Sequence, residues 1–287
     1  MEIKSRLINK MNRLKNKLEV VKYRLYNLVK RSSGVNFYSR NQPLIVSLTT
    51  YPKRFNIVYL TIESLMNQTI KPDKIILWLA KDELNEGKIP QKIFKLKSRG
   101  LEIRIVNENL RSYKKLIYTI KEFKESNIIT CDDDVIYPKF FIEGLYSKFK
   151  EFPNAIIAYR CAFMKKVNDH QLETYLNWGP PENNQPSFNL FPTGVGGILY
   201  PSNSLHNKVL DKELFLNLSP IGDDIWFKAM ALLNNTKTVM VNEKSTEFPT
   251  IQGSQDDALW HVNVNEYKND EQIRNVFNYF KLFKYIQ

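Results

Sequence analysis

Cysteine, histidine and long apolar runs are scarce in this chain. Its 287 residues include two cysteines and three histidines. Cys131 and Cys161 both stand in apolar segments typical of strands, so we expect buried thiols and a reducing compartment, the cytoplasm. No run reaches the roughly 18 apolar residues that a membrane-spanning helix needs, so we expect no span. The first residues form no continuous apolar segment with a small-residue cleavage site, which argues against a secretory signal.

Two nucleotide-binding fingerprints are also missing. No GxGxxG pattern follows the first apolar strand, which argues against a dinucleotide-binding fold, and no GxxxxGK[ST] pattern occurs anywhere.

Hydrophobic residues make up 43% of the chain, which is enough for a sizeable core. This length is typical of one large domain or two small ones.

The net charge of +12 is concentrated at the N-terminus. Residues 1–31 contain ten Lys or Arg against two Glu, a net charge of +8, which leaves +4 for the rest of the chain. They contain no Gly or Pro, and their apolar residues are spaced alternately four and three apart. These are Leu7, Met11, Leu14, Leu18, Val21, Leu25 and Leu28. The pattern predicts a basic amphipathic helix with a heptad seam.

Three roles are open for this helix. Its apolar stripe could pack on the globular domain of the same chain, join two subunits in a short coiled coil, or lie on an anionic membrane surface. Nucleic-acid binding is less favoured, because the basic residues are not interleaved with a recognisable binding module. Residues 32–42 then form a linker to a catalytic domain over residues 43–287.

Strands and helices alternate about every 30 residues after this linker. Apolar, β-branched segments predict strands at 44–51, 71–80, 101–107 and 127–131, and helical spacing predicts helices at 56–68, 89–100 and 112–123. The second helix begins with Pro90 and ends at Gly100, the usual asymmetry of helix termini. This alternation predicts an α/β fold with a parallel sheet and right-handed crossovers.

Three consecutive aspartates, 132–134, follow the fourth predicted strand directly. In an extended turn Asp132 and Asp134 point to one side and Asp133 to the other. Two carboxylates facing one way suit Mg²⁺ or Mn²⁺, which prefer hard oxygen ligands. The alternatives are a solvated acidic turn or the N-cap of the helix that follows.

Ligands of parallel sheets collect beyond the carboxyl ends of the strands. The carboxyl end of the first predicted strand and the loop after it carry Thr49, Tyr51 and Arg54. We therefore expect these side chains and the aspartates at 132–134 to converge on one cleft. Turn chemistry around Pro52 is the alternative for the loop.

Four segments together resemble a known family. "LIVSLTTYPKRFNIVYLTIESLMNQTIKPDKIILWLA", "CDDDVIYP", "GVGGILYP" and "GDDIWF" look like bacterial glycosyltransferases of the GT-A fold, family-two-like, from capsule and surface-polysaccharide loci. The resemblance covers roughly residues 43–265. It implies a mostly parallel central sheet flanked by helices, with a nucleotide-binding half over 43–137 and an acceptor-side half over 138–287. It also implies a nucleotide-sugar donor, with uridine diphosphate favoured, and bound Mn²⁺ or Mg²⁺.

The resemblance also implies roles for the acidic residues. Asp132 faces the nucleoside ribose and joins Asp134 in holding the metal, and the late His261 completes the metal shell. A histidine packed beside a tryptophan is the alternative for His261. The paired acids at 223–224 resemble the element whose second acid is the base of an inverting transfer. That places the base at Asp224, with Asp223 in support, although this chain has DD where ED is common. Helix capping is the alternative for both.

The remaining donor-binding candidates come from four short segments of the chain. They are Asp133, the loop residues Thr49, Tyr51 and Arg54, the helix-entry cations Lys114 and Lys115 with Arg111, and Gly196 and Gly197 with Gly194. A cation at a helix start can contact a diphosphate, with a solvated helix face as the alternative. Glycine permits close approach of the backbone beneath a donor sugar, with a bulge or tight turn as the alternative. Trp178 and Tyr200 could offer flat surfaces to sugar rings or could simply pack.

We therefore expect a metal-dependent glycosyltransferase that moves a sugar from a nucleotide-sugar donor to a growing surface-polysaccharide acceptor, by inversion. It would be cytoplasmic, at the inner face of the plasma membrane, with a membrane contact or a homodimer through residues 1–31 and no nucleic-acid partner. One alternative is a nucleotidyltransferase acting on sugar phosphates, although "TTYPKRF" is not a Gly-rich phosphate loop. The other is a non-enzymatic basic scaffold that recruits acidic partners or nucleic acid.

Overall fold

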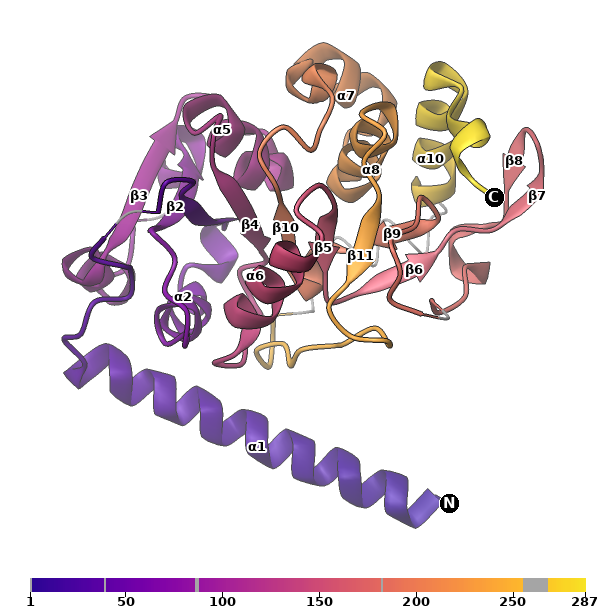
Figure 1. The fold of residues 1–287 in the computed structure, drawn as a ribbon. Coiled ribbons are helices and arrows are strands. Elements are labelled where there is room, and N and C mark those ends of the chain that lie inside the picture. Colours follow the sequence, from indigo (N-terminus) through magenta and orange to yellow (C-terminus); the bar gives the residue numbers. More distant parts are fainter. Residues whose placement is uncertain (1, 39, 86–87, 182, 255–267) are drawn as a thin grey trace.

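The computed structural model describes residues 2–38, 40–85, 88–181, 183–254 and 268–287. Within these residues, seven strands form one central sheet in the order β11-β5-β10-β4-β1-β2-β3 (Figure 1). The strands are β1 Leu44–Thr49, β2 Lys74–Ala80, β3 Leu101–Val106, β4 Asn127–Cys131, β5 Ile156–Ala158, β10 Ile198–Tyr200 and β11 Thr238–Met240. All neighbours are parallel except β10, which runs antiparallel to both β4 and β5. The predicted α/β class with a mostly parallel, helix-flanked sheet is confirmed.

Two layers of helices cover the two faces of this sheet. One apolar cluster joins the sheet to α5 (Lys114–Glu122), α8 (Asp223–Leu233) and α10 (Lys268–Phe280), and the other joins it to α2 (Val58–Met66) and α6 (Phe141–Glu151). Consecutive strand residues alternate between the layers, so Ile128 belongs to the first cluster and Ile129 to the second. Strands buried on both faces become near-continuous apolar runs, which is why the sequence revealed them.

Shorter elements complete the described part of the chain. Two small antiparallel pairs lie outside the main sheet: β6 (Cys161–Phe163) with β9 (Leu190–Pro192), and β7 (Lys166–Asn168) with β8 (Gln171–Leu172). The short helices are α3 Lys81–Asn85, α4 Gln91–Phe94 and α7 Lys212–Leu218. The 3-10 turns are η1 Pro52–Arg54, η2 Lys95–Arg99, η3 Arg111–Tyr113, η4 Tyr175–Asn177, η5 Gly194–Gly196, η6 Asn207–Leu210 and η7 Leu282–Tyr285.

The helix predicted at 89–100 is only partly α-helical. It consists of the four-residue α4 followed by the 3-10 turn η2, and Gly100 ends it with φ of 105°. The buried residues of this segment are Ile93, Leu96 and Arg99, each three positions after the last. A spacing of three matches the 3-10 helix, whose side chains at i and i+3 lie in line.

The predicted N-terminal helix is present as α1, Glu2–Val29. However, its apolar stripe does not pack on the globular body: the stripe residues from Met11 to Leu28 are each between 50% and 64% exposed. The alternative in which this stripe packs on the globular domain is therefore wrong for the described side chains. Instead, Tyr23 and Asn27 on another face are buried beside α2, because Asn27 Nδ2 donates to Glu63 Oε1 (3.2 Å) and to the Lys92 carbonyl (3.0 Å).

Three further expectations can be checked. Cys131 and Cys161 are free, buried thiols, as predicted. Among the described residues, no helix is both long enough and apolar enough to cross a bilayer. Trp178 and Tyr200 are buried, so packing is the outcome for both.

Candidate active site

A pocket of about 950 Å³ opens at the carboxyl ends of β1 and β4. The structure brings most of the predicted site residues to its wall: Thr49, Tyr51, Arg54, Lys114, Lys115, Asp132, Asp133, Asp134, Gly196, Asp223 and Asp224. They come from the end of β1 and the loop after it, the turn after β4, the 3-10 turn η5, and the first turns of α5 and α8. The structure shows where these residues lie, and their roles in binding and catalysis stay predictions.

Arg54 neutralises two of the three consecutive aspartates. Its Nη1 donates to Asp133 Oδ1 at 2.6 Å, and its Nη2 lies 3.2 Å from Asp134 Oδ2. Burial alone would lower the pKa of Arg54, but these two carboxylates outweigh it and raise that pKa. Burial also raises the pKa of Asp133, and it raises the pKa of Asp134 to about 6 with a further contribution from repulsion by Asp132.

The expected alternation of the three aspartates is wrong. Asp133 and Asp134 share the guanidinium of Arg54, whereas Asp132 accepts a 2.9 Å hydrogen bond from Lys115 Nζ. The reason is local, because the chain leaves the strand after Cys131 and turns at residues 133 and 134 instead of continuing extended.

Lys115 joins the turn after β4 to the start of α8. Its ammonium lies 2.9 Å from Asp132 Oδ1 and 3.2 Å from Asp223 Oδ2. Burial would lower the pKa of Lys115, but the carboxylates of Asp132, Asp223 and Asp224 raise it well above its ordinary value. The group therefore remains a cation at the floor of the pocket.

Asp224 lies beside this cation on the first turn of α8. Its Oδ2 accepts a 2.8 Å hydrogen bond from the Gly194 N–H. Removal from water and then repulsion by Asp223 raise the pKa of Asp224 to about 7, although Lys115 and the Gly194 N–H oppose the shift. Capping does not explain these acids, because Gly222 is the N-cap and no side chain caps the helix.

Gly194 marks the point where the charged groups converge. A β-carbon added there would lie 3.1 Å from Lys115 Nζ, 3.2 Å from Asp224 Oδ1 and 3.4 Å from Asp132 Oδ1. The absence of a side chain lets three charged groups from three elements meet at one place. The neighbouring Gly196 lines the pocket, whereas Gly197, with φ of 75°, faces Phe141 and is not part of the wall. The predicted alternative of a tight turn is therefore confirmed for Gly194–Gly196, which form the 3-10 turn η5.

The predicted cations at the start of α5 have different surroundings. Lys114 is buried, with Nζ bound to the Glu83 carboxylate and 3.0 Å from Asn109 Oδ1. Both Lys114 and Lys115 are buried, so a solvated helix face is wrong for them, while Arg111 is exposed at the rim. The predicted metal ligand His261 lies outside the described residues.

The carboxylate oxygens of this pocket are ligands that suit a hard divalent cation. Carboxylate oxygens of Asp132 and Asp224 lie close together at the pocket floor, and Mg²⁺ often takes few protein carboxylates and completes its shell with water and phosphate oxygens. Asp132 is the more open of the predicted ligands, with a side chain 28% exposed against 5% for Asp134. Within the described residues no three His, Cys, Asp or Glu side chains form a ready-made metal cluster.

Sequence reasoning missed three polar residues of the pocket and its surroundings. Thr50 Oγ1 donates to Asp133 Oδ2 at 2.5 Å, and Ser254 Oγ donates to Asp134 Oδ2 at 2.9 Å. Arg160 lines the pocket just after β5, so the rule that located Arg54 would have found it had this three-residue strand been recognised. Ser254 has no local signal, because it stands 120 positions after its partner.

Comparison with known proteins gives a weak structural likeness and no relative. No protein-family model matches the chain, and no curated protein matches it. Solved structures that resemble it include S. aureus TarS 1–349 (14% identity, TM-score 0.45), the same protein in complex with UDP (13%, 0.43) and in complex with UDP-GlcNAc (14%, 0.45). The likeness covers 72% of this chain and 59%, 59% and 57% of those chains, so it spans less than two thirds of their length.

Proposed function

We propose that this chain is a glycosyltransferase that moves a hexose or related sugar from a nucleotide sugar, with UDP as the nucleotide, to a hydroxyl of a surface-polysaccharide acceptor. The observation that carries the proposal is the convergence of Asp132, Lys115 and Asp224 around Gly194. It lies in a large pocket at the carboxyl ends of β1 and β4, where ligands of parallel sheets collect. The resemblance of four sequence segments to GT-A enzymes supports the same proposal.

The charges of the pocket suit a diphosphate. Lys115 stays protonated between three carboxylates, and Arg160 and Arg111 add cations along the wall and the rim. Asp132, the more open of the predicted ligands, would hold a divalent cation, and Asp134 would join it once that carboxylate leaves Arg54. The bound cation would supply Lewis-acid neutralisation of the leaving nucleoside diphosphate. The protein's own cations orient the same phosphates.

Asp224 is the proposed base. A carboxylate whose pKa is about 7 is substantially ionised at neutral pH and still accepts a proton effectively. The acceptor oxygen bonds to the anomeric carbon while the bond from that carbon to the diphosphate oxygen breaks. The hydroxyl proton goes to Asp224, and the departing diphosphate keeps the electron pair. Attack opposite the leaving group inverts the anomeric centre.

The test is a thermal-shift panel of nucleotide sugars with and without Mn²⁺, followed by measurement of nucleoside diphosphate release. We expect a UDP-sugar to raise the melting temperature and to be turned over. Asp132→Ala should weaken donor binding, and Asp224→Asn should keep donor binding but lose turnover. The exposed Asp169→Asn serves as control, since its carboxylate is 89% exposed. If no nucleotide sugar binds, or if pyrophosphate is released from a nucleoside triphosphate and a sugar phosphate instead, the proposal is wrong.

A further inference from the structure

The outward face of α1 is apolar although the helix is held firmly to the body. Leu14, Leu18, Val21 and Leu25 are each at least 50% exposed, and Leu28 extends the same stripe. The opposite side carries the anchoring contacts, and Asn16 Nδ2 adds a 2.9 Å hydrogen bond to the Thr250 carbonyl. Figure 1 shows α1 lying along the outside of the molecule below α2. The stripe is therefore presented to whatever lies beyond the protein.

Basic residues border this stripe on both sides. Lys15 and Lys22 directly follow stripe residues along the helix, and Lys17 and Arg24 directly precede them. In a coiled coil these are the flanking positions that face the partner helix, so a second copy of α1 would bring cations against cations in either orientation. An apolar stripe between two basic borders instead complements the hydrocarbon and the phosphates of an anionic lipid surface.

A basic pocket continues the stripe at the end of α1. Its volume is about 440 Å³, and its wall includes Leu28, Arg31, Lys95, Lys97 and Arg99. Phe94, which is 51% exposed, adds an apolar edge. The pocket therefore repeats, at one place, the combination of apolar and cationic groups found along the helix.

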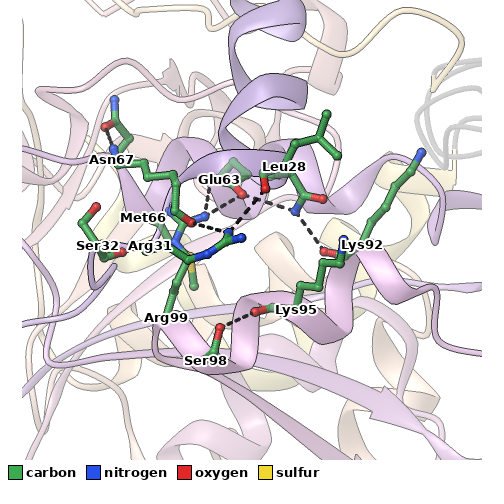
Figure 2. Close-up of polar contacts among 12 residues, drawn as sticks. Leu28, Arg31, Ser32, Glu63, Met66, Asn67, Lys92, Lys95, Ser98 and Arg99 are labelled. Atoms are coloured by element: carbon green, nitrogen blue, oxygen red, sulfur yellow. Dashed lines mark hydrogen bonds and ion pairs between the residues drawn. The ribbon is translucent and has the colours of Figure 1, made fainter.

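One donor of this pocket has no partner within the described residues. Arg99 is 5% exposed; its Nη1 donates to both Glu63 oxygens at 2.7 and 2.8 Å, and its Nε donates to the Ser32 carbonyl at 3.1 Å (Figure 2). Its Nη2 is buried and makes no hydrogen bond there. A buried, unsatisfied guanidinium donor is costly unless an acceptor reaches it.

The surroundings of Arg99 keep the pocket positive. Glu63, which faces it, is already bound by Arg99 and Asn27. Burial lowers the pKa of Lys30 and of Lys71, and repulsion by neighbouring cations, Arg99 among them, lowers both further. Such repulsion is expected where basic groups outnumber the acidic groups beside them. Lys30 donates to the neutral Asn67 Oδ1 at 2.6 Å, and Glu63 offsets its charge only in part, because burial and Arg99 outweigh that carboxylate.

We propose that the outer face of α1, together with the pocket of Arg99, docks this protein on an anionic phospholipid membrane. The apolar stripe lies at the level of the acyl chains, the flanking lysines and arginines meet the headgroups, and a lipid phosphate enters the pocket. An amphipathic helix lying in the interface plane in this way binds without crossing the bilayer. The inference is independent of the chemistry proposed for the active site.

Flotation with vesicles tests the proposal on the full chain. We expect binding to phosphatidylcholine vesicles that contain phosphatidylglycerol, weak binding to phosphatidylcholine alone, and loss of binding as salt is raised. Leu18→Glu with Leu25→Glu should weaken binding by roughly tenfold or more for each leucine. The control is Lys208→Glu with Leu216→Glu, two exposed residues, which should bind like the wild type. Figure 1 shows α7, which carries Leu216, on the side of the molecule away from α1.

A second pair of variants tests the pocket itself. Lys95→Glu with Lys97→Glu leaves the stripe intact and should weaken binding to anionic vesicles by about fivefold for each cation lost, more than the control pair does. An effect no larger than the control's refutes the pocket. The membrane proposal is wrong if the wild type does not bind anionic vesicles or binds both vesicle types equally. It is also wrong if the wild type is a dimer that Leu18→Glu with Leu25→Glu dissociates.

Discussion

Asp224→Asn should make the protein more stable while it abolishes turnover. Removal from water and repulsion by Asp223 raise the pKa of Asp224 from its ordinary 3.8 to about 7 in the folded protein. Between these two values the folded chain holds a proton that the unfolded chain releases. The free energy of unfolding therefore falls as the pH rises through this window, and it stays low above pH 7.

The magnitude follows from the width of the window. Each pH unit between the two pKa values is worth about 1.4 kcal/mol, so ionising Asp224 costs at most about 4 kcal/mol at pH 8. Asparagine removes this cost, keeps an oxygen for the Gly194 N–H and deprives Lys115 of one neighbouring charge. We expect a net gain of about 2–4 kcal/mol, which corresponds to a rise in melting temperature of roughly 4–16 °C.

Thermal melts from pH 4 to pH 8 measure this effect. The difference between Asp224→Asn and the wild type should be close to zero near pH 4, grow up to pH 7 and then level off. Asp169→Asn, at an exposed carboxylate, should remain within about 0.5 kcal/mol of the wild type at every pH. A variant that is no more stable than the wild type at pH 8, or a difference that is independent of pH, refutes the reasoning.

Three other substitutions test separate parts of the structure. Glu63→Gln should cost about 3–5 kcal/mol in denaturant unfolding, because it leaves a buried guanidinium uncompensated, whereas Glu102→Gln at a more exposed pair should cost at most about 1 kcal/mol. Gly194→Ala should reduce turnover at least tenfold by crowding the charged cluster, while Gly179→Ala, which meets only a flexible lysine side chain, should leave it unchanged. Lys228→Met should raise the melting temperature at pH 7, because burial lowers the pKa of Lys228 to about 7; the gain should shrink as the pH rises towards 10.5, where the unfolded lysine is also neutral. An unchanged melting temperature in Lys228→Met, equal costs for the two glutamate variants, or equal turnover of the two glycine variants contradicts the corresponding argument.

The first half of the fold could be predicted from the sequence because burial on both faces makes its strands apolar throughout. β1, β2 and β4 have almost no exposed residue, so their runs stand out between amphipathic helices. The second half could not be predicted in the same way. β5, β10 and β11 have three residues each, which is too short for a period to show, and β10 runs against its neighbours.

The candidate site was predictable where position along the sheet decides it. Residues that directly follow β1 and β4 had to meet at one edge, and they do. The hydrogen bonds and ion pairs were not predictable, because they depend on distant segments. Arg54 reaches Asp133 across 79 positions, and the orientation of Asp133 follows from that contact instead of from strand alternation.

Three adjacent carboxylates are tolerated here because two cations divide them. Arg54 takes Asp133 and Asp134, and Lys115 takes Asp132. The division has a chemical consequence. Lys115 also contacts Asp223, so a single ammonium links the acids after β4 to those that begin α8. A ligand that draws Asp132 away from Lys115 must therefore change the electrostatic field at Asp224, which also lies beside Gly194, and so change the affinity of that carboxylate for a proton. In the proposed reaction, donor binding at Asp132 and the proton affinity of the base Asp224 would therefore be coupled through Lys115, whose ammonium contacts both Asp132 and Asp223.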